Sequence, residues 1–204
     1  MPDRIGRLNA EELRRALGRC TIGHEIIVLA ETTSTNDSVL QRVVSSTPEG
    51  LVIFAERQNA GRGQRSNRWE SAAEKGLWFS ILLRPQISVA ESAQLTTWAA
   101  QTVAQTILTE FGLPVAIKLP NDVYVNGKKI AGVLVEMRAQ KNASHLAILG
   151  IGINVHHRAK DFSKSLRERA ISLAMVLGRD IDRSKFAIAL LRNLDRTYDQ
   201  LRGL

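Results

Sequence analysis

Glycines and arginines gather in one stretch of the sequence, AERQNAGRGQRSNRWES (residues 55–71). Gly61 and Gly63 flank Arg62, and Arg65 follows. Glycine lets backbone N–H groups come close to an anion, and arginine adds charge-assisted donors for phosphate or carboxylate. A loop of this length inside a compact domain is usually functional or disordered. The stretch therefore predicts either an anion-binding loop or a basic surface loop.

A second polar stretch, ETTSTND (residues 31–37), places Ser34, Thr35 and Asn36 before the apolar positions of a helix. Hydroxyl and amide side chains at a helix start usually cap its free backbone N–H groups. They can also hold a small polar ligand at the same end. Spacing alone favours the cap and leaves the ligand interpretation open.

Two polar side chains interrupt apolar strands further along the chain. Asp122 follows the sequence KLPN, and Asn154 lies between an isoleucine and a valine. An unpaired polar group in a buried strand costs about 1–3 kcal/mol, so each side chain needs a partner. Asp122 is either a turn former or a ligand for Mg²⁺ and phosphate. Asn154 is either a structural amide or a ligand contact.

Adjacent lysines, Lys128 and Lys129, open the apolar run IAGVLV. Side chains alternate between the faces of a strand, so at most one of the two can enter a pocket. A lysine at a strand start is usually solvated, whereas a lysine inside a pocket neutralises an anion. Gly132, within the run, allows a close approach to the strand.

Composition limits the class of protein. The 204 residues are 44% apolar and 24% charged, which is typical of one globular domain. The net charge of +8 suits polyanionic partners, but basic residues are not interleaved with aromatics, so nucleic acid is not favoured. A single cysteine, no apolar run long enough for a membrane span and no signal peptide predict a cytoplasmic protein. His156 and His157 lack metal-ligand spacing, and we expect them at the surface.

Apolar periodicity and turn residues predict the elements that must position these groups. Strands are expected at residues 25–30, 51–54, 77–83, 123–125, 130–135 and 146–155. Helices are expected after Asn9, after Ser34 and at residues 89–111, 165–178 and 182–201. The buried helix faces include Val39, Leu40, Val43, Val44, Trp98 and Leu108. Asn126-Gly127 predicts a two-residue hairpin. The pattern indicates an α+β fold with a mixed, mostly antiparallel sheet flanked by helices.

Five segments together, and in this order, resemble the biotin protein ligases. They are ETTSTND, AERQNAGRGQRSNRWES, GLWFSILLRP, KLPNDVYVNGKKIAGVLVE and GIGINVH. The resemblance covers about residues 8–201. It implies the fold of the biotin–lipoate ligase catalytic domain, which is similar to that of class II aminoacyl-tRNA synthetases.

The resemblance also implies a chemistry. The carboxylate of biotin attacks the α-phosphate of ATP with Mg²⁺, and a lysine of a biotin carboxyl carrier domain then attacks the biotinyl-5′-AMP. The residues implied for catalysis are Lys129 and Arg62. Those implied for biotin are Ser34, Thr35, Asn36, Gln58, Gly61, Arg62, Gly63, Gln64, Lys129, Gly132 and Gly152. Those implied for ATP are Arg65, Trp69, Asn121, Asp122 and Asn154, with Asp122 also as the Mg²⁺ ligand.

The sequence departs from the family pattern in several places. Gln64 and Asn67 replace arginines of the usual glycine–arginine loop, and Leu119 replaces a tryptophan. Arg65 is expected to take over a phosphate contact. We expect a single catalytic domain over residues 1–204, without an N-terminal winged helix and without the family's C-terminal SH3-like domain. Relatives often pair through the sheet, which makes a homodimer compatible with the resemblance, and we expect the loop to be disordered without ligand.

Two alternatives stay open from the residues. The first is a lipoate or octanoate ligase or transferase of the same fold. The second is a basic, non-catalytic module that binds anions with a steep salt dependence.

Overall fold

A mixed sheet forms the centre of the molecule. The computed structural model describes residues 6–139 and 145–202, and within them it has one seven-stranded sheet. The strands are β1 (Glu25–Leu29), β2 (Leu51–Ala55), β3 (Gly76–Leu83), β4 (Ala116–Lys118), β5 (Asp122–Val125), β6 (Lys128–Arg138) and β7 (Leu146–Asn154). Their order is β1-β2-β3-β7-β6-β5-β4, and only the β1–β2 pair is parallel. The predicted mixed, mostly antiparallel sheet is therefore confirmed.

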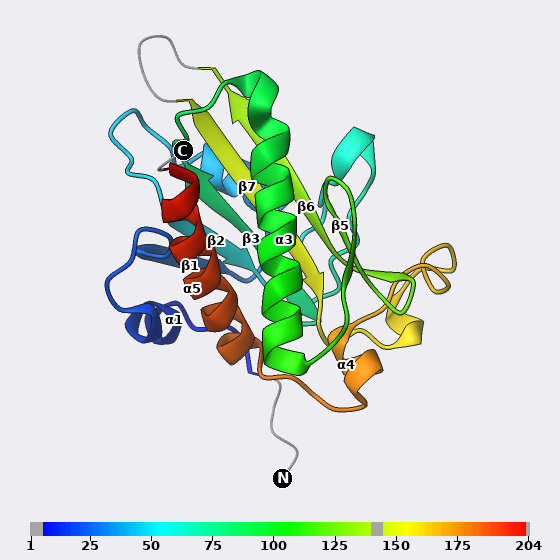
Figure 1. Ribbon diagram of the computed structural model, residues 1–204. Coiled ribbons are helices and arrows are strands. Elements are labelled where there is room, and N and C mark those ends of the chain that lie inside the picture. The colour runs from blue at the N-terminus through cyan, green and yellow to red at the C-terminus, as the bar shows by residue number, and fades with distance from the viewer. Residues whose placement is uncertain (1–5, 140–144, 203–204) are drawn as a thin grey trace.

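Helices cover both faces of this sheet unequally. They are α1 (Ala10–Leu17), α2 (Thr35–Leu40), α3 (Ser92–Phe111), α4 (Leu173–Leu177) and α5 (Arg183–Arg202), with short 3-10 turns η1 (Gln64–Ser66), η2 (Val89–Glu91) and η3 (Ala159–Asp161). The long helices α3 and α5 lie side by side across one face (Figure 1). The short α2 packs against β2, β3 and β7 through a smaller apolar cluster.

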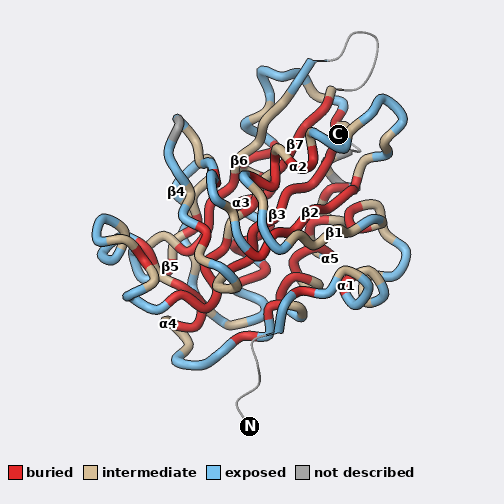
Figure 2. Tube along the Cα trace, turned by 180° about the vertical axis from the view of Figure 1, so that it is seen from behind, coloured by how far each residue is buried: buried red, intermediate tan, exposed pale blue. Residues whose placement is uncertain are grey.

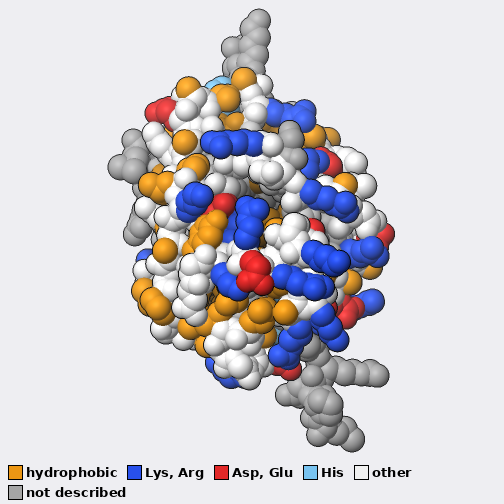
Figure 3. All heavy atoms as spheres, turned by 90° about the vertical axis from the view of Figure 1, so that its right-hand side faces the viewer, with side chains coloured by type: hydrophobic (Ala, Val, Ile, Leu, Met, Phe, Trp, Pro, Cys, Tyr) orange, Lys and Arg blue, Asp and Glu red, His pale blue; other side chains and the backbone are white. Residues whose placement is uncertain are grey.

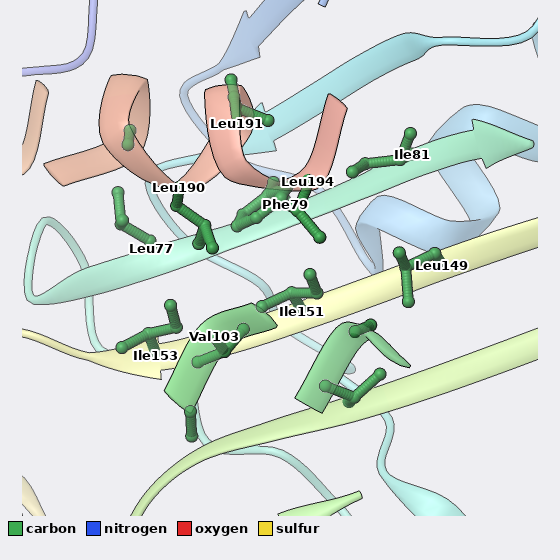
Figure 4. Close-up of a cluster of buried hydrophobic side chains, with 14 of the residues drawn as sticks. Leu77, Phe79, Ile81, Val103, Leu149, Ile151, Ile153, Leu190, Leu191 and Leu194 are labelled. Carbon is green, nitrogen blue, oxygen red and sulfur yellow. The ribbon is translucent and has the colours of Figure 1, made fainter. Parts of the chain in front are cut away.

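Strict alternation along β7 separates a packed face from a hollow one. Leu149, Ile151 and Ile153 belong to the large core under α3 and α5 (Figure 4). Gly150 and Gly152, between them, face the other way because side chains of a strand alternate. Buried residues run along the central strands while the connecting loops stay exposed (Figure 2). One face of the sheet is thus filled and the other is left open over the glycines.

The hairpin between β5 and β6 confirms the expected two-residue turn. Asn126 and Gly127 have φ of 50° and 72°, the left-handed values that this turn requires. The register of β5 on β6 shifts between Val123 and Tyr124. The turn and the register shift together set which way the side chains at the start of β6 point.

The base of the glycine–arginine loop is held by a buried ion pair. Glu56, which follows β2, contacts Arg183 of α5 at 2.7 Å between Oε2 and Nη1, with both side chains almost fully buried. Its backbone oxygen accepts a hydrogen bond from the N–H of Glu74, at 3.0 Å. The two ends of residues 56–74 are therefore closed against each other, and the loop projects from a rigid base.

The expected helix at residues 165–178 is wrong over its first half. Only Leu173–Leu177 are helical, capped by Ser172, whose Oγ accepts from the N–H of Met175. The preceding segment instead pairs with the start of β6: Lys129 N donates to Arg169 O at 2.8 Å, and Ile171 N donates to Lys129 O at 3.0 Å. Backbone pairing with the sheet has overridden the local helical pattern.

Three smaller expectations also fail. Helix α2 ends at Leu40, so Val44 is 61% exposed, and Leu108 on α3 is 45% exposed. His156 and His157 are each 2% exposed rather than at the surface. The His156 Nε2 accepts from Ile181 N at 3.0 Å, and the His157 ring stacks on that of Phe162. Burial lowers the pKa of His157 to about 4, because the charged imidazolium is poorly solvated there.

Across the residues that the structure describes, no helix is both long and apolar enough to cross a membrane.

Candidate functional site

A cavity of about 310 Å³ opens on the glycine face of the sheet. Its floor is a row of paired small residues, because Gly132 of β6 lies opposite Gly152 of β7, and Gly150 lies opposite Ser80 of β3. A methyl group on Gly150 would lie 2.5 Å from the Asn36 side chain. Glycine is needed here because other elements touch the strand backbone itself.

The N-terminal end of α2 closes one side of the cavity with polar groups. Ser34, Thr35 and Asn36 are each 4% exposed and all line the cavity. The Ser34 side chain makes no cap hydrogen bond, so the simple cap interpretation is wrong for this residue. Thr35 N instead donates to Gln58 Oε1 at 2.8 Å, and Ser80 Oγ lies 2.5 Å from Asn36 Oδ1. These polar groups therefore hold one another in place at the cavity wall.

The glycine–arginine segment, residues 61–69, folds back on itself as a small hairpin over the cavity. Trp69 N donates to Gly61 O at 2.9 Å, and Gly63 N donates to Asn67 O at 2.7 Å. A methyl group on Gly61 would lie 2.7 Å from Trp69 O, so this close approach requires glycine. Arg65 adopts the left-handed conformation with φ of 55°.

Trp69 closes the floor from above. Methyl groups on Gly152 and Gly132 would lie 2.6 Å and 2.9 Å from its ring atoms, so the indole lies directly on the glycine pair. Its Nε1 is buried without a hydrogen-bond partner. The Trp69 ring also stands edge-on to Trp78, with the centroids 6.0 Å apart. An aromatic surface therefore covers the glycine floor, and it carries a buried N–H donor without a hydrogen-bond partner.

Arg62 lines the cavity but is paired with protein carboxylates. Its Nη1 and Nη2 donate to the two Asp37 oxygens at 2.7 and 2.8 Å, and Nη2 also donates to Glu136 Oε2 at 3.1 Å. The hydrogen bonds from Arg62 hold the pKa of Asp37 below its usual range, against a smaller opposing effect of burial. Neither carboxylate was expected from the sequence, because the contacts join residues 25 and 74 positions apart.

Lys129 enters the same cavity from β6. Its Nζ lies 2.6 Å from Asp122 Oδ1, and 5.4 Å from the centre of the Trp69 ring. Lys128 points away and lies 3.9 Å from the exposed Glu168. The expectation that only one of the adjacent lysines enters a pocket is confirmed.

Asp122 fits a Mg²⁺ role only with help from a ligand. It is the sole carboxylate among the cavity-lining residues, and its contact with Lys129 lacks hydrogen-bond angles. Within the described residues, no cluster of three or more potential metal ligands exists. Mg²⁺ in nucleotide sites is commonly held by one or two carboxylates plus phosphate oxygens, so Asp122 suits an ion that arrives with the nucleotide.

Most of the expected site residues come together here. Besides those above, the cavity lining includes Gln58, Gly63, Gln64, Arg65 and Asn121. Gly61 supports the loop from outside the lining, and Asn154 is buried with its Nδ2 donating to Ile171 O at 3.1 Å. Asn154 is therefore a satisfied structural amide in this structure. Asp37, Glu136 and Ser80 were not singled out for the site from the sequence, and Gly150, Arg68 and Lys118, which lie in the polar clusters, were given no role there.

The face in Figure 3 carries many Lys and Arg side chains. Within the cavity lining, Arg65, Arg68, Lys118 and Lys129 face a single carboxylate, Asp122, while Arg62 is paired with Asp37 and Glu136 at the rim. Such an excess of cationic donors around a hollow favours a polyanionic ligand.

Comparison with known proteins agrees with this geometry. The chain is 36% identical over 193 residues to the bifunctional ligase/repressor BirA of Bacillus spizizenii, which covers 95% of this chain and 59% of that protein. It is 31% identical to the biotin–[acetyl-CoA-carboxylase] ligase of Mycobacterium tuberculosis, over 88% of this chain and 66% of that one. The chain thus spans about three-fifths of the length of the curated BirA relative.

A solved structure shares the fold. The biotin protein ligase from Aquifex aeolicus, in complex with biotin and ATP, superposes with a TM-score of 0.76 at 31% identity. The match covers 88% of this chain and 72% of that one. Residues 28–154 also match the family model of the biotin/lipoate A/B protein ligases. The sheet, the glycine floor and the cations Arg62 and Lys129 at one cavity agree with this match. This chain belongs to the biotin/lipoate A/B protein ligase family.

Proposed function

We propose that this chain is the catalytic part of an ATP-dependent biotin protein ligase. In the first step a biotin carboxylate oxygen bonds to the α-phosphorus of ATP, and the bond to pyrophosphate breaks. In the second step a lysine amine of a carrier domain attacks the biotinyl carbonyl and loses its proton, and AMP leaves. The supporting observation is that Lys129, Arg62 and the polar start of α2 line one cavity with a glycine floor.

Lys129 is the residue assigned to the chemistry. Two negatively charged reactants meet in the first step, and negative charge develops at the leaving AMP in the second. A fixed cation at this point stabilises both transition states without having to reorganise. Lys129 suits that role because β6 places it in the cavity and its carboxylate partner is Asp122 alone.

The other residues divide between the two ligands. Thr35, Asn36 and Gln58 offer hydroxyl and amide groups for the ring system of biotin, with Gly132 and Gly152 leaving room beside the strand. Arg65, Arg68 and Lys118 suit the phosphates of ATP, with Trp69 against adenine. Asp122 would hold Mg²⁺, which neutralises phosphate charge when the nucleotide is bound. The acceptor is a biotin carboxyl carrier domain. Pairing of two copies through the sheet stays a prediction that light scattering tests.

The experiment is biotin-dependent release of pyrophosphate from ATP and Mg²⁺, followed by mass spectrometry of a carrier domain. We expect release with biotin and a mass gain on one carrier lysine. Lipoate and octanoate serve as parallel substrates, because the family includes lipoate enzymes. Release with lipoate and not with biotin would reassign the substrate, and release with none would reject the activity.

A further inference from the structure

Arg62 connects three separate parts of the chain. It belongs to the segment 61–69, while Asp37 lies in α2 and Glu136 lies in β6. Asp37 receives two parallel hydrogen bonds from the guanidinium, at 2.7 and 2.8 Å, which is the fork geometry that arginine forms with carboxylates. The side chains of Arg62 and Glu136 are each 39% exposed and that of Asp37 is 36% exposed. The cluster therefore lies at the rim of the cavity, where solvent reaches it.

The charges of this cluster argue against Arg62 as a free anion binder. One guanidinium faces two carboxylates, so the three side chains together carry a net charge of about −1 at neutral pH. An incoming carboxylate or phosphate would meet two like charges beside the arginine. The arginine would have to release both protein partners to bind the ligand through its side chain.

The same cluster continues into the cavity wall. Glu136 Oε2 also accepts from Asn36 Nδ2 at 2.6 Å, and Asn36 Oδ1 contacts Ser80 on the floor. Arg62 is thus bound to a network whose other end is the polar side of the cavity. The Glu136 carboxylate is thus shared between Arg62 at the rim and Asn36 in the cavity wall.

The segment has few other anchors on this side. Glycines flank Arg62, and the backbone hydrogen bonds of Gly61 and Gly63 run to Trp69 and Asn67 within the same segment. Those bonds keep the hairpin folded but do not attach it to the sheet. Trp69, which lies on Gly132 and Gly152, is carried by the same hairpin. Arg62 is therefore the charged side-chain tie between the hairpin and both α2 and β6, beside the packing of Trp69 on the glycines.

We propose that Asp37 and Glu136 are positioning residues, a carboxylate latch that holds Arg62 and keeps the hairpin of residues 61–69 closed over the cavity. Asp37 and Glu136 act through Arg62 and do not touch the reacting atoms. This role rests on the proposed function only where it concerns ligand retention, since the contacts of the latch join residues of this chain alone.

The test is hydrogen–deuterium exchange of the ligand-free chain, read on peptides covering residues 61–69. Asp37→Asn and Glu136→Gln remove charge and keep shape, and each should speed exchange there, by about tenfold for Asp37→Asn, allowing for partial exposure of the pair. Asp180→Asn is the matched control, because Asp180 forms a comparable exposed pair with Arg158, at 3.2 Å. Exchange unchanged in both latch variants would overturn the proposal.

A double variant distinguishes a positioning role through Arg62 from a general destabilisation of the segment 61–69. In an Arg62→Gln background the carboxylates have nothing to hold, so adding Asp37→Asn should change exchange no further. If the exchange rate of the double variant rises by the product of the two single-variant increases, the proposal is overturned.

Ligand retention provides the second readout. If the proposed function holds, biotinyl-5′-AMP should dissociate about tenfold faster from Asp37→Asn, with its formation rate retained. A retained dissociation rate would overturn the part concerning ligands. Failure of the parent chain to bind biotin at all would reject the proposed function, while the exchange data would still decide whether the latch exists.

Discussion

Two of the cations that line the cavity, Arg62 and Lys129, are held in opposite ways. Arg62 stands on a glycine-flanked hairpin and is tied by two carboxylates at the solvent-exposed rim. Lys129 stands on β6 beside its register shift with β5, is 29% exposed, and has one carboxylate partner and one aromatic ring beside it. A loop cation with two protein carboxylates ties the loop to them, whereas a cation with one carboxylate partner on a sheet strand can exchange that partner for substrate charge. We infer that Arg62 holds the cavity closed and Lys129 serves the chemistry.

Removing the lysine should have the largest effect. Lys129→Ala should lower the rate of biotin-dependent pyrophosphate release by about 10²–10³-fold, the usual loss when a fixed electrostatic stabiliser is removed. Lys128→Ala is the matched control, because that side chain faces Glu168 and not the cavity. Equal losses in the two variants would reject the assignment of strand faces.

As the pH falls, the fold should lose stability at a higher pH than the one at which the Asp37–Arg62 pair breaks. Burial sets the pKa of His157 at about 4, below the ordinary value near 6.5 for the unfolded chain, so folding favours the neutral form. The stability from that preference is complete above pH 6.5 and is lost as the pH falls toward 4. The loss in free energy of unfolding is about 2–3 kcal/mol by linkage. Urea unfolding at pH 7 and pH 4.5 measures it.

The controls for that titration are His157→Phe and the latch itself. Phenylalanine keeps a ring against Phe162 and should flatten the dependence between pH 6.5 and 4. Because the pKa of Asp37 is lowered, its pair with Arg62 keeps its stabilisation above the unfolded value of about 3.9 and loses it only as the pH falls below that. Exchange of residues 61–69 that rises already at pH 5–6 would contradict this order.

Adding a methyl group to the glycine floor should have a smaller effect on the free energy of unfolding, and the structural change should be at Trp69. Gly152→Ala places a methyl group within about 2.6 Å of the indole, so the tryptophan must move. Such overpacking usually costs about 1–3 kcal/mol. Thermal unfolding measures the cost, and the fluorescence of Trp69 should shift as its ring leaves the sheet.

A Trp69→Ala background gives the comparison that this interpretation needs. The added methyl group should then cost much less, because the indole is gone. A cost that persists would show that the strand itself, and not Trp69, requires glycine at this position.

The features that the sequence predicted correctly depend on residues close together in the chain, and those that it missed depend on residues far apart. The strands and the Asn126-Gly127 turn depend on neighbours along the chain. Alternation predicted only that at most one of Lys128 and Lys129 enters a pocket, and the choice of Lys129 came from the family resemblance. In the structure Lys129 lies beside the register shift of β5 on β6 and lines the cavity. The helix at residues 165–178 failed because pairing with Lys129, far away in sequence, replaced local hydrogen bonds. The same is true of His156 and His157, which later segments of the chain cover.

The site shows the same division. Arg62 was expected in the cavity because a stretch rich in glycine and arginine is typical of an anion-binding loop. Its partners were not expected, since Asp37 looks like an ordinary polar residue of a helix start and Glu136 ends a long apolar run. Contacts across 25 and 74 positions depend on where the hairpin docks, which no local pattern contains.

Single-turnover formation and release of biotinyl-5′-AMP, measured by rapid quench and ligand chase in Arg62→Gln and Lys129→Ala, separates the two cations. We expect Lys129→Ala to slow formation by about 100-fold or more. We expect Arg62→Gln to keep formation within a few-fold and to release the adenylate about tenfold faster. A formation rate that falls equally in both variants, with release unchanged, would contradict the division of roles between Arg62 and Lys129.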